Sequence, residues 1–123
     1  MEEVGREKGE KKRFDLEDRT LRFARGVLRL VNNVPRSLAN VEVCKQLIRS
    51  AGSVGANYIE ANEALSKRDF VFRLRIARKE AKEARYWLHL LHNGDNRQDD
   101  NAALVQEATE LLRILSAIIE KSK

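Results

Sequence analysis

The sequence has few of the residues that cross-link small domains or shape β architectures. Among its 123 residues are one cysteine, one proline and six glycines, and only 6% are aromatic. Cys44 alone excludes an internal disulfide and any metal site built from several cysteines. The shortage of turn residues and aromatics argues against a sandwich or barrel and favours an all-α protein.

Long apolar runs are also missing. No run approaches the roughly 20 residues that a membrane span needs, and the first residues are charged, unlike a signal peptide. We therefore expect a cytoplasmic protein with no membrane partner. A length of 123 residues suits one domain, because a single core accommodates about 100–150 residues.

Charge is what the sequence has in abundance, and it is concentrated in one segment. Charged residues make up 35% of the chain and the net charge is +5. Residues 66–94 carry eight basic and three acidic side chains, an excess equal to the net charge of the whole chain. A basic balance of this kind permits a polyanionic partner.

Apolar residues recur at intervals of three and four in four segments, which predicts four helices. Residues 1–13 lack this pattern, so we expect a flexible charged tail followed by a bundle domain over residues 14–123. The expected helix boundaries are marked by Pro35, by Ser37 or Asn40, by Ser66, by Asn93 with Gly94, and by Asp99 or Asp100.

Short connections between these helices favour an antiparallel up-down-up-down four-helix bundle. The spacing of threes and fours favours left-handed packing. Gly52 and Gly55 lie inside the second helical segment, where each costs about 1 kcal/mol relative to alanine. They predict a close approach of another backbone at this helix.

Two basic stripes are the strongest candidates for a binding surface. Arginine outnumbers lysine in both, and its planar guanidinium suits phosphate. The alternative is a solvated face that neutralises acids on neighbouring helices or subunits. The stripes consist of Arg19, Arg22, Arg25 and Arg29 on the first helical segment and of Arg68, Arg75, Arg78, Lys82 and Arg85 on the third.

Polar side chains on the second and third helical segments predict a partly buried network that fixes helix register or a subunit contact. If the network is buried, Glu83→Gln should cost about 3–5 kcal/mol by leaving a partner charge unpaired. The expected members are Arg49, Asn57, Glu60, Lys79, Glu80 and Glu83.

The enzyme alternative is a bundle that holds two metals between carboxylates. Such sites need a histidine three residues after a glutamate on two helices, whereas Glu60 and Glu80 are each followed at that spacing by another glutamate. His89 and His92 are three residues apart but lack a third ligand nearby. We expect no catalytic residue, no metal and no cofactor.

Three stretches carry a family resemblance: residues 46–61 (QLIRSAGSVGANYIEA), 66–70 (SKRDF) and 79–88 (KEAKEARYWL). Together they resemble the 23S rRNA intervening-sequence protein family, and the similarity covers nearly everything from Phe14 onward. Much of that family has a serine where this chain has Glu80. The chain therefore resembles the branch with a Lys-Glu-Ala-x-Glu motif, and no role of that serine is carried over.

The resemblance implies an antiparallel four-helix bundle that assembles as a homopentamer and has no established enzymatic activity. Some members are encoded in insertions within 23S ribosomal RNA genes, which suggests association with RNA. A more distant similarity is to the accessory variability proteins of diversity-generating retroelements, basic pentamers that bind nucleic acid and a reverse transcriptase.

The residue pattern and the resemblance lead to one hypothesis: a non-catalytic homo-oligomeric scaffold that binds the RNA or DNA backbone through its arginine stripes, with little base specificity. The alternative is a protein-interaction subunit, for example an accessory protein that docks on a reverse transcriptase. The sequence leaves open whether Tyr86 and Trp87 face the core or a partner.

Overall fold

The computed structural model describes residues 4–94 and 98–123, and these residues form four helices. They are α1 (Val4–Val31), α2 (Leu38–Asn62), α3 (Lys67–Leu90) and α4 (Gln98–Lys121). No strand occurs among the described residues, so the prediction of an all-α protein with four helices is confirmed.

The first helix begins earlier than expected. It starts at Val4, inside the segment 1–13 that the sequence assigns to a charged tail; residues 1–3 of that segment lie outside the described residues. Lysine, arginine and glutamate are good helix formers, so the helix extends into a segment that lacks an apolar stripe. Leu16 is the first described side chain that is buried, and the flexibility of the tail stays a prediction.

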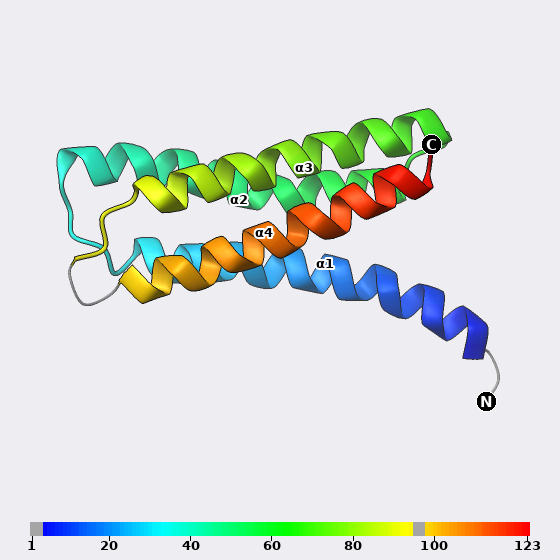
Figure 1. The fold of residues 1–123 in the computed structure, drawn as a ribbon, viewed down its shortest axis with the longest axis horizontal. Coiled ribbons are helices and arrows are strands. Elements are labelled where there is room, and N and C mark those ends of the chain that lie inside the picture. The colour runs from blue at the N-terminus through cyan, green and yellow to red at the C-terminus, as the bar shows by residue number, and fades with distance from the viewer. Residues whose placement is uncertain (1–3, 95–97) are drawn as a thin grey trace.

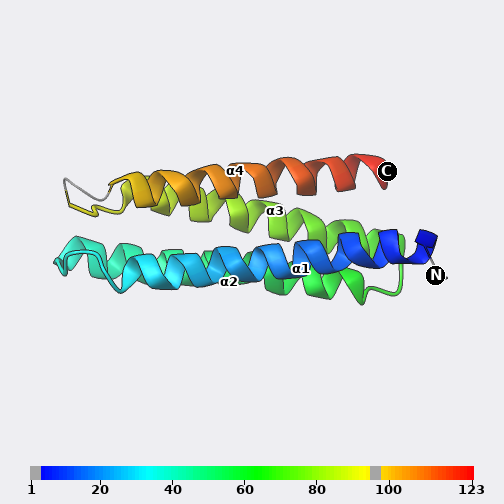
Figure 2. The ribbon, with the colours of Figure 1, turned by 90° about the horizontal axis from the view of Figure 1, so that it is seen from below.

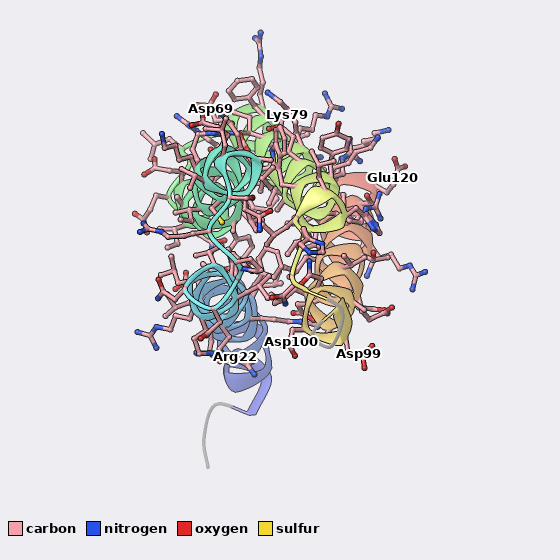
Figure 3. The ribbon with its side chains drawn as sticks, turned by 90° about the vertical axis from the view of Figure 1, so that its left-hand side faces the viewer. Arg22, Asp69, Lys79, Asp99, Asp100 and Glu120 are labelled. Carbon is pink, nitrogen blue, oxygen red and sulfur yellow. The ribbon has the colours of Figure 1, made fainter. Side chains whose placement is uncertain are left out.

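The helices form two layers of two. Successive helices run in opposite directions along the long axis, and the first turns of α1 extend past the end of the other helices (Figure 1). Figure 2 shows α1 and α2 in one layer and α3 and α4 in the other. Seen end-on, α1 and α3 lie at diagonal corners, and α4 contacts both (Figure 3).

Serine caps start two of the helices at the positions that the sequence indicates. The Ser37 side chain accepts a hydrogen bond from the Asn40 backbone N–H at 3.0 Å, and Ser66 accepts one from the Asp69 N–H at 3.1 Å. Each satisfies one donor that the first helical turn leaves unpaired. The cap expected at Asp99 or Asp100 is wrong, because both residues lie inside the first turn of α4.

The core is aliphatic, and each helix contributes to it. Phe23, Leu47, Leu74 and Leu111, one from each helix, are all at most 2% exposed. The α3 side of the core is built largely from alanines at Ala77, Ala81 and Ala84. Small side chains let helix axes approach closely, which fits the extensive packing of α3 against both α2 and α4.

The two glycines of α2 differ in their surroundings. A Cβ added at Gly55 would lie 2.8 Å from the Thr20 hydroxyl oxygen and 3.2 Å from its Cβ, whereas one added at Gly52 would meet nothing within 4 Å. The close approach predicted by these glycines is therefore confirmed at Gly55, against α1, and wrong at Gly52.

Buried asparagines join the loops at one end of the bundle. Asn40 donates to the carbonyls of Pro35 and His92, at 2.9 and 2.7 Å. Asn101 at the start of α4 donates to the carbonyls of Leu88 and Leu91, at 3.2 and 3.0 Å. The bonds to Leu88, Leu91 and His92 satisfy carbonyls at or just after the end of α3.

None of the helices within the described ranges has an apolar stretch of the length that a membrane span requires.

Candidate nucleic-acid interface

The groove between α3 and α4 gathers most of the basic stripe of α3. It is an open groove of about 890 Å³, and the residues that line it include six cations and no carboxylate. Thr109, Leu112 and Ser116 of α4 supply its other wall. The cations are Arg75, Arg78, Lys79, Lys82, Arg85 and Arg113.

Hydroxyl groups orient two of these arginines. Arg78 Nη1 lies 3.4 Å from the Ser116 hydroxyl, and Arg85 Nη1 donates to the Thr109 hydroxyl at 3.2 Å. A neutral hydroxyl positions a guanidinium without neutralising it, so both arginines keep their full charge and further donors for an anion.

The positive charge of the groove affects a carboxylate at the C-terminal end of α4. The pKa of Glu120 is lowered, mainly by its hydrogen bond and ion pair with Lys123, and further by the charges of Arg78 and Arg75. This carboxylate is exposed and points to the outer side of α4 (Figure 3).

The basic stripe of α1 has a different setting. Arg19 forms a two-pronged ion pair with Glu107 of α4, with Nε to Oε2 at 2.7 Å and Nη2 to Oε1 at 3.0 Å. Arg22 pairs with Asp18 at 2.9 Å. Arg29 lines two hollows between α1 and α4, one of which includes Asp100 and the other Glu107.

The two stripes therefore lie on opposite flanks of α4. The α1 stripe faces carboxylates of α4 and the α3 stripe faces its hydroxyls. Arg25 and Arg68, the remaining members of the two stripes, are exposed. The sequence could not distinguish these settings, because the face that α4 turns to each neighbour depends on packing.

The polar network joins α2 to α3 around one arginine. Arg49 donates to Glu80 through Nη2 at 3.1 Å and Nη1 at 3.4 Å, and to Glu83 through Nη2 at 3.1 Å. Hydrogen bonding to Glu80 is the main reason that the pKa of Arg49 is raised. The Glu80 side chain is 9% exposed and that of Glu83 is 40% exposed. Within this network the Glu80 carboxylate is therefore buried, whereas that of Glu83 is only half-buried.

Three other expected members lie outside this cluster. Asn57 accepts from Arg73 at 3.4 Å and donates to the Ser53 carbonyl at 2.9 Å. Among the side chains that the structure describes, none hydrogen-bonds or forms an ion pair with Glu60 or Lys79. Lys79 instead lines the basic groove and lies at the outer edge of the molecule (Figure 3).

The orientation of the two aromatic residues is now defined. Tyr86 is 59% exposed, whereas Trp87 is half-buried and packs against the core. Their rings meet edge to face, with centroids 5.1 Å apart and an interplanar angle of 77°.

Some residues of the groove were not singled out from the sequence. Thr109, Arg113 and Ser116 follow one another at intervals of four and three, so they share a face of α4. The spacing indicates that these three residues share a face, but only the packing of α4 on α3 turns that face toward the arginines. Within the described part of the chain, no group of three or more histidine, cysteine or acidic residues is arranged to hold a metal ion.

Comparison with known proteins identifies the family. The family model described as 23S rRNA-intervening sequence protein matches residues 12–117. The chain belongs to this family. The match covers α2 and α3 entirely and most of α1 and α4, and it includes every residue of the basic groove.

A solved structure supports the same assignment. A crystal structure of a protein with unknown function from the S23 ribosomal protein family of Bacteroides thetaiotaomicron is similar to this chain with a TM-score of 0.74 and 34% sequence identity. The similarity covers 84% of this chain and 96% of that one. Among curated proteins, none matches this chain.

Proposed function

We propose that this family member is a non-catalytic, homo-oligomeric helical scaffold that binds the phosphate backbone of RNA or DNA in the groove between α3 and α4. The observation that carries the proposal is the lining of that groove, with six cations and no carboxylate. Phosphate contacts of this kind position a nucleic acid without reading its sequence, so we expect little base specificity.

The contrast between the two stripes supports the choice of groove. Arg19 and Arg22 of α1 already pair with carboxylates, and a phosphate would have to compete with these partners. Arg78 and Arg85 contact hydroxyls instead. We therefore assign the main contact to α3 and a smaller contribution to the arginines of α1.

The oligomeric part of the proposal has a candidate surface on the other layer. Val41, Ile48 and Ile59 on α2 and Leu21 and Leu28 on α1 are each 37–48% exposed. Large apolar side chains gathered on two neighbouring helices are typical of protein interfaces. We propose that copies of the chain, an antiparallel left-handed bundle, associate through this face as a homopentamer.

The direct test compares two double variants with equal loss of charge. Arg75→Gln with Arg78→Gln removes two groove cations, and Arg36→Gln with Lys45→Gln removes two exposed cations outside both stripes. Binding of a labelled RNA of about 15 nucleotides should weaken at least tenfold for the groove variant. The control variant should bind within about twofold of the unmodified protein, because only long-range charge is lost.

The outcome separates this function from its alternative. Equal weakening by both variants would contradict a contact at the groove. No RNA or DNA binding by the unmodified protein at low salt would contradict nucleic-acid binding altogether and would favour a protein-interaction subunit whose arginines meet acidic protein surfaces.

A further inference from the structure

The outer face of α3 carries a second pattern that overlaps the groove. Five residues follow one another at intervals of three and four, so they form one stripe along the helix. All five are exposed, and the two at the ends are aromatic. The stripe consists of Phe72, Arg75, Lys79, Lys82 and Tyr86.

The aromatic ends enclose the cations. Phe72 is 58% exposed and Tyr86 is 59% exposed, and at 1.5 Å per residue their backbones lie about 21 Å apart. The three cations between them also line the groove between α3 and α4. The stripe is therefore one edge of the proposed phosphate-binding surface.

The aromatic rings at the two ends of the stripe, Phe72 and Tyr86, are not buried in the core of the bundle. Phe72 and Tyr86 are each more than half exposed, so covering their rings with a partner would bury apolar surface favourably. The edge contact with Trp87 limits the movement of the Tyr86 ring, so less conformational freedom is lost when a flat partner binds to it.

One acidic neighbour of the stripe, Glu83, is already paired with a cation of α2. Glu83 lies next to Lys82 in the sequence, but its carboxylate accepts a hydrogen bond from Arg49 on the α2 side. The stripe itself contains aromatic rings and cations and no carboxylate. Carboxylates lie at its margins: Glu120 is within range of the charge of Arg75, and the hollow beside Phe72 is lined by Glu60, Glu63 and Asp69.

We propose that the ligand of this surface is a single-stranded nucleic acid, whose bases stack on Tyr86 and Phe72 while its phosphates lie against the three cations. This inference rests on the proposed function. Base faces are open to side chains in single strands, whereas in a duplex neighbouring base pairs cover them. A distance of about 21 Å accommodates roughly six nucleotides at a rise of 3.4 Å, and fewer in a stretched strand.

The test uses the full chain and a labelled, unstructured RNA of about 15 nucleotides, alone and annealed to its complement. The unmodified protein should bind the single strand at least tenfold more tightly than the duplex. Tyr86→Ala should weaken single-strand binding by about 5- to 150-fold and leave duplex binding unchanged. Tyr86→Phe, which keeps the ring, should retain most of the affinity.

A second readout comes from Trp87, the one tryptophan of the chain. Because its ring lies 5.1 Å from that of Tyr86, a base stacked on Tyr86 should change its fluorescence when the single strand is added. The duplex should leave the emission unchanged.

Three results would overturn the inference. Equal affinity for duplex and single strand, with no effect of Tyr86→Ala, would refute stacking while leaving phosphate binding intact. No binding of either RNA would refute the proposed function as well. A fall in oligomeric mass in Tyr86→Ala would show that the ring lies between copies of the chain.

Discussion

At the scale of single residues, the cost of breaking the cluster between α2 and α3 depends on which partner is removed. Arg49→Met leaves the Glu80 carboxylate buried without its charged partner, and we expect a loss of about 1–3 kcal/mol in the free energy of unfolding. Glu83→Gln should cost at most about 0.5 kcal/mol, because Glu83 and Arg49 are 40% and 52% exposed and exposed pairs contribute little. Urea denaturation of the two variants measures both values.

A larger loss of stability in Glu83→Gln than in Arg49→Met would contradict this account of the cluster. If Glu83→Gln proved the more destabilising change, the burial of Glu80 would not be what makes the cluster important. The charge of Arg49 itself adds no pH dependence near neutrality. Its pKa is raised by Glu80, so its contribution is fully present below the ordinary pKa of arginine and is lost only in strong base.

Cys44 should react slowly with thiol reagents. Burial raises the pKa of its thiol, and only the thiolate is nucleophilic. At about pH 7.5 the fraction of thiolate is therefore smaller than in a free cysteine, and alkylation by iodoacetamide should be slower. The rate should rise with pH, and the midpoint of this rise should lie at a higher pH than for free cysteine. Alkylation as fast as that of the free amino acid would contradict the burial.

At the scale of helices, the two glycines of α2 should respond in opposite ways to alanine. Gly52→Ala meets nothing within 4 Å, so the gain in helix propensity should stabilise the protein by about 0.5–1 kcal/mol. Gly55→Ala would place its Cβ 2.8 Å from the Thr20 hydroxyl oxygen and should destabilise it by about 1–3 kcal/mol. Thermal unfolding by circular dichroism compares the two, and a lower melting temperature for Gly52→Ala would contradict the open space seen there.

The positions of the helices can be predicted from the local sequence. Which neighbouring helix packs against each face of a helix cannot. The caps at Ser37 and Ser66 and the positive φ at Gly94 depend on residues close in the chain, so the sequence indicated where α2 and α3 begin and where the chain turns after α3. The difference between Gly52 and Gly55 depends on where α1 crosses α2. That crossing is set by side-chain packing over the whole core.

The same limit applies to the candidate site. The basic stripe of α3 was evident from spacing alone, and so was that of α1. Their different surroundings, hydroxyls for Arg78 and a carboxylate for Arg19, arise from the face that α4 turns toward each. The sequence does not distinguish Phe72, because an aromatic residue in an amphipathic pattern is usually part of the core; only its exposure marks it as a candidate contact.

At the scale of the whole molecule, the apolar face of α1 and α2 should govern assembly. A homopentamer would have a mass of about five times the 14.1 kDa of one chain. Ile48→Glu places a charge on this face and should lower the mass in solution toward that of one chain, since an unpaired charge is costly at an apolar interface. Light scattering measures the mass.

Leu65→Glu is the matched control for assembly. Leu65 is 99% exposed in the connection between α2 and α3, outside this face, so the mass should not change. A monomer without any substitution, or an Ile48→Glu protein of undiminished mass, would contradict association through α1 and α2.

The most direct test of the central claim is the salt dependence of RNA binding by the unmodified protein. If the groove neutralises about five phosphates, the logarithm of the binding constant should fall with the logarithm of salt concentration with a slope near −3.5 for a single strand and near −4.5 for duplex DNA. Fluorescence anisotropy from about 50 to 200 mM salt covers the range in which such a slope is evident. A slope near zero would contradict a function based on the cations of α3 and α4.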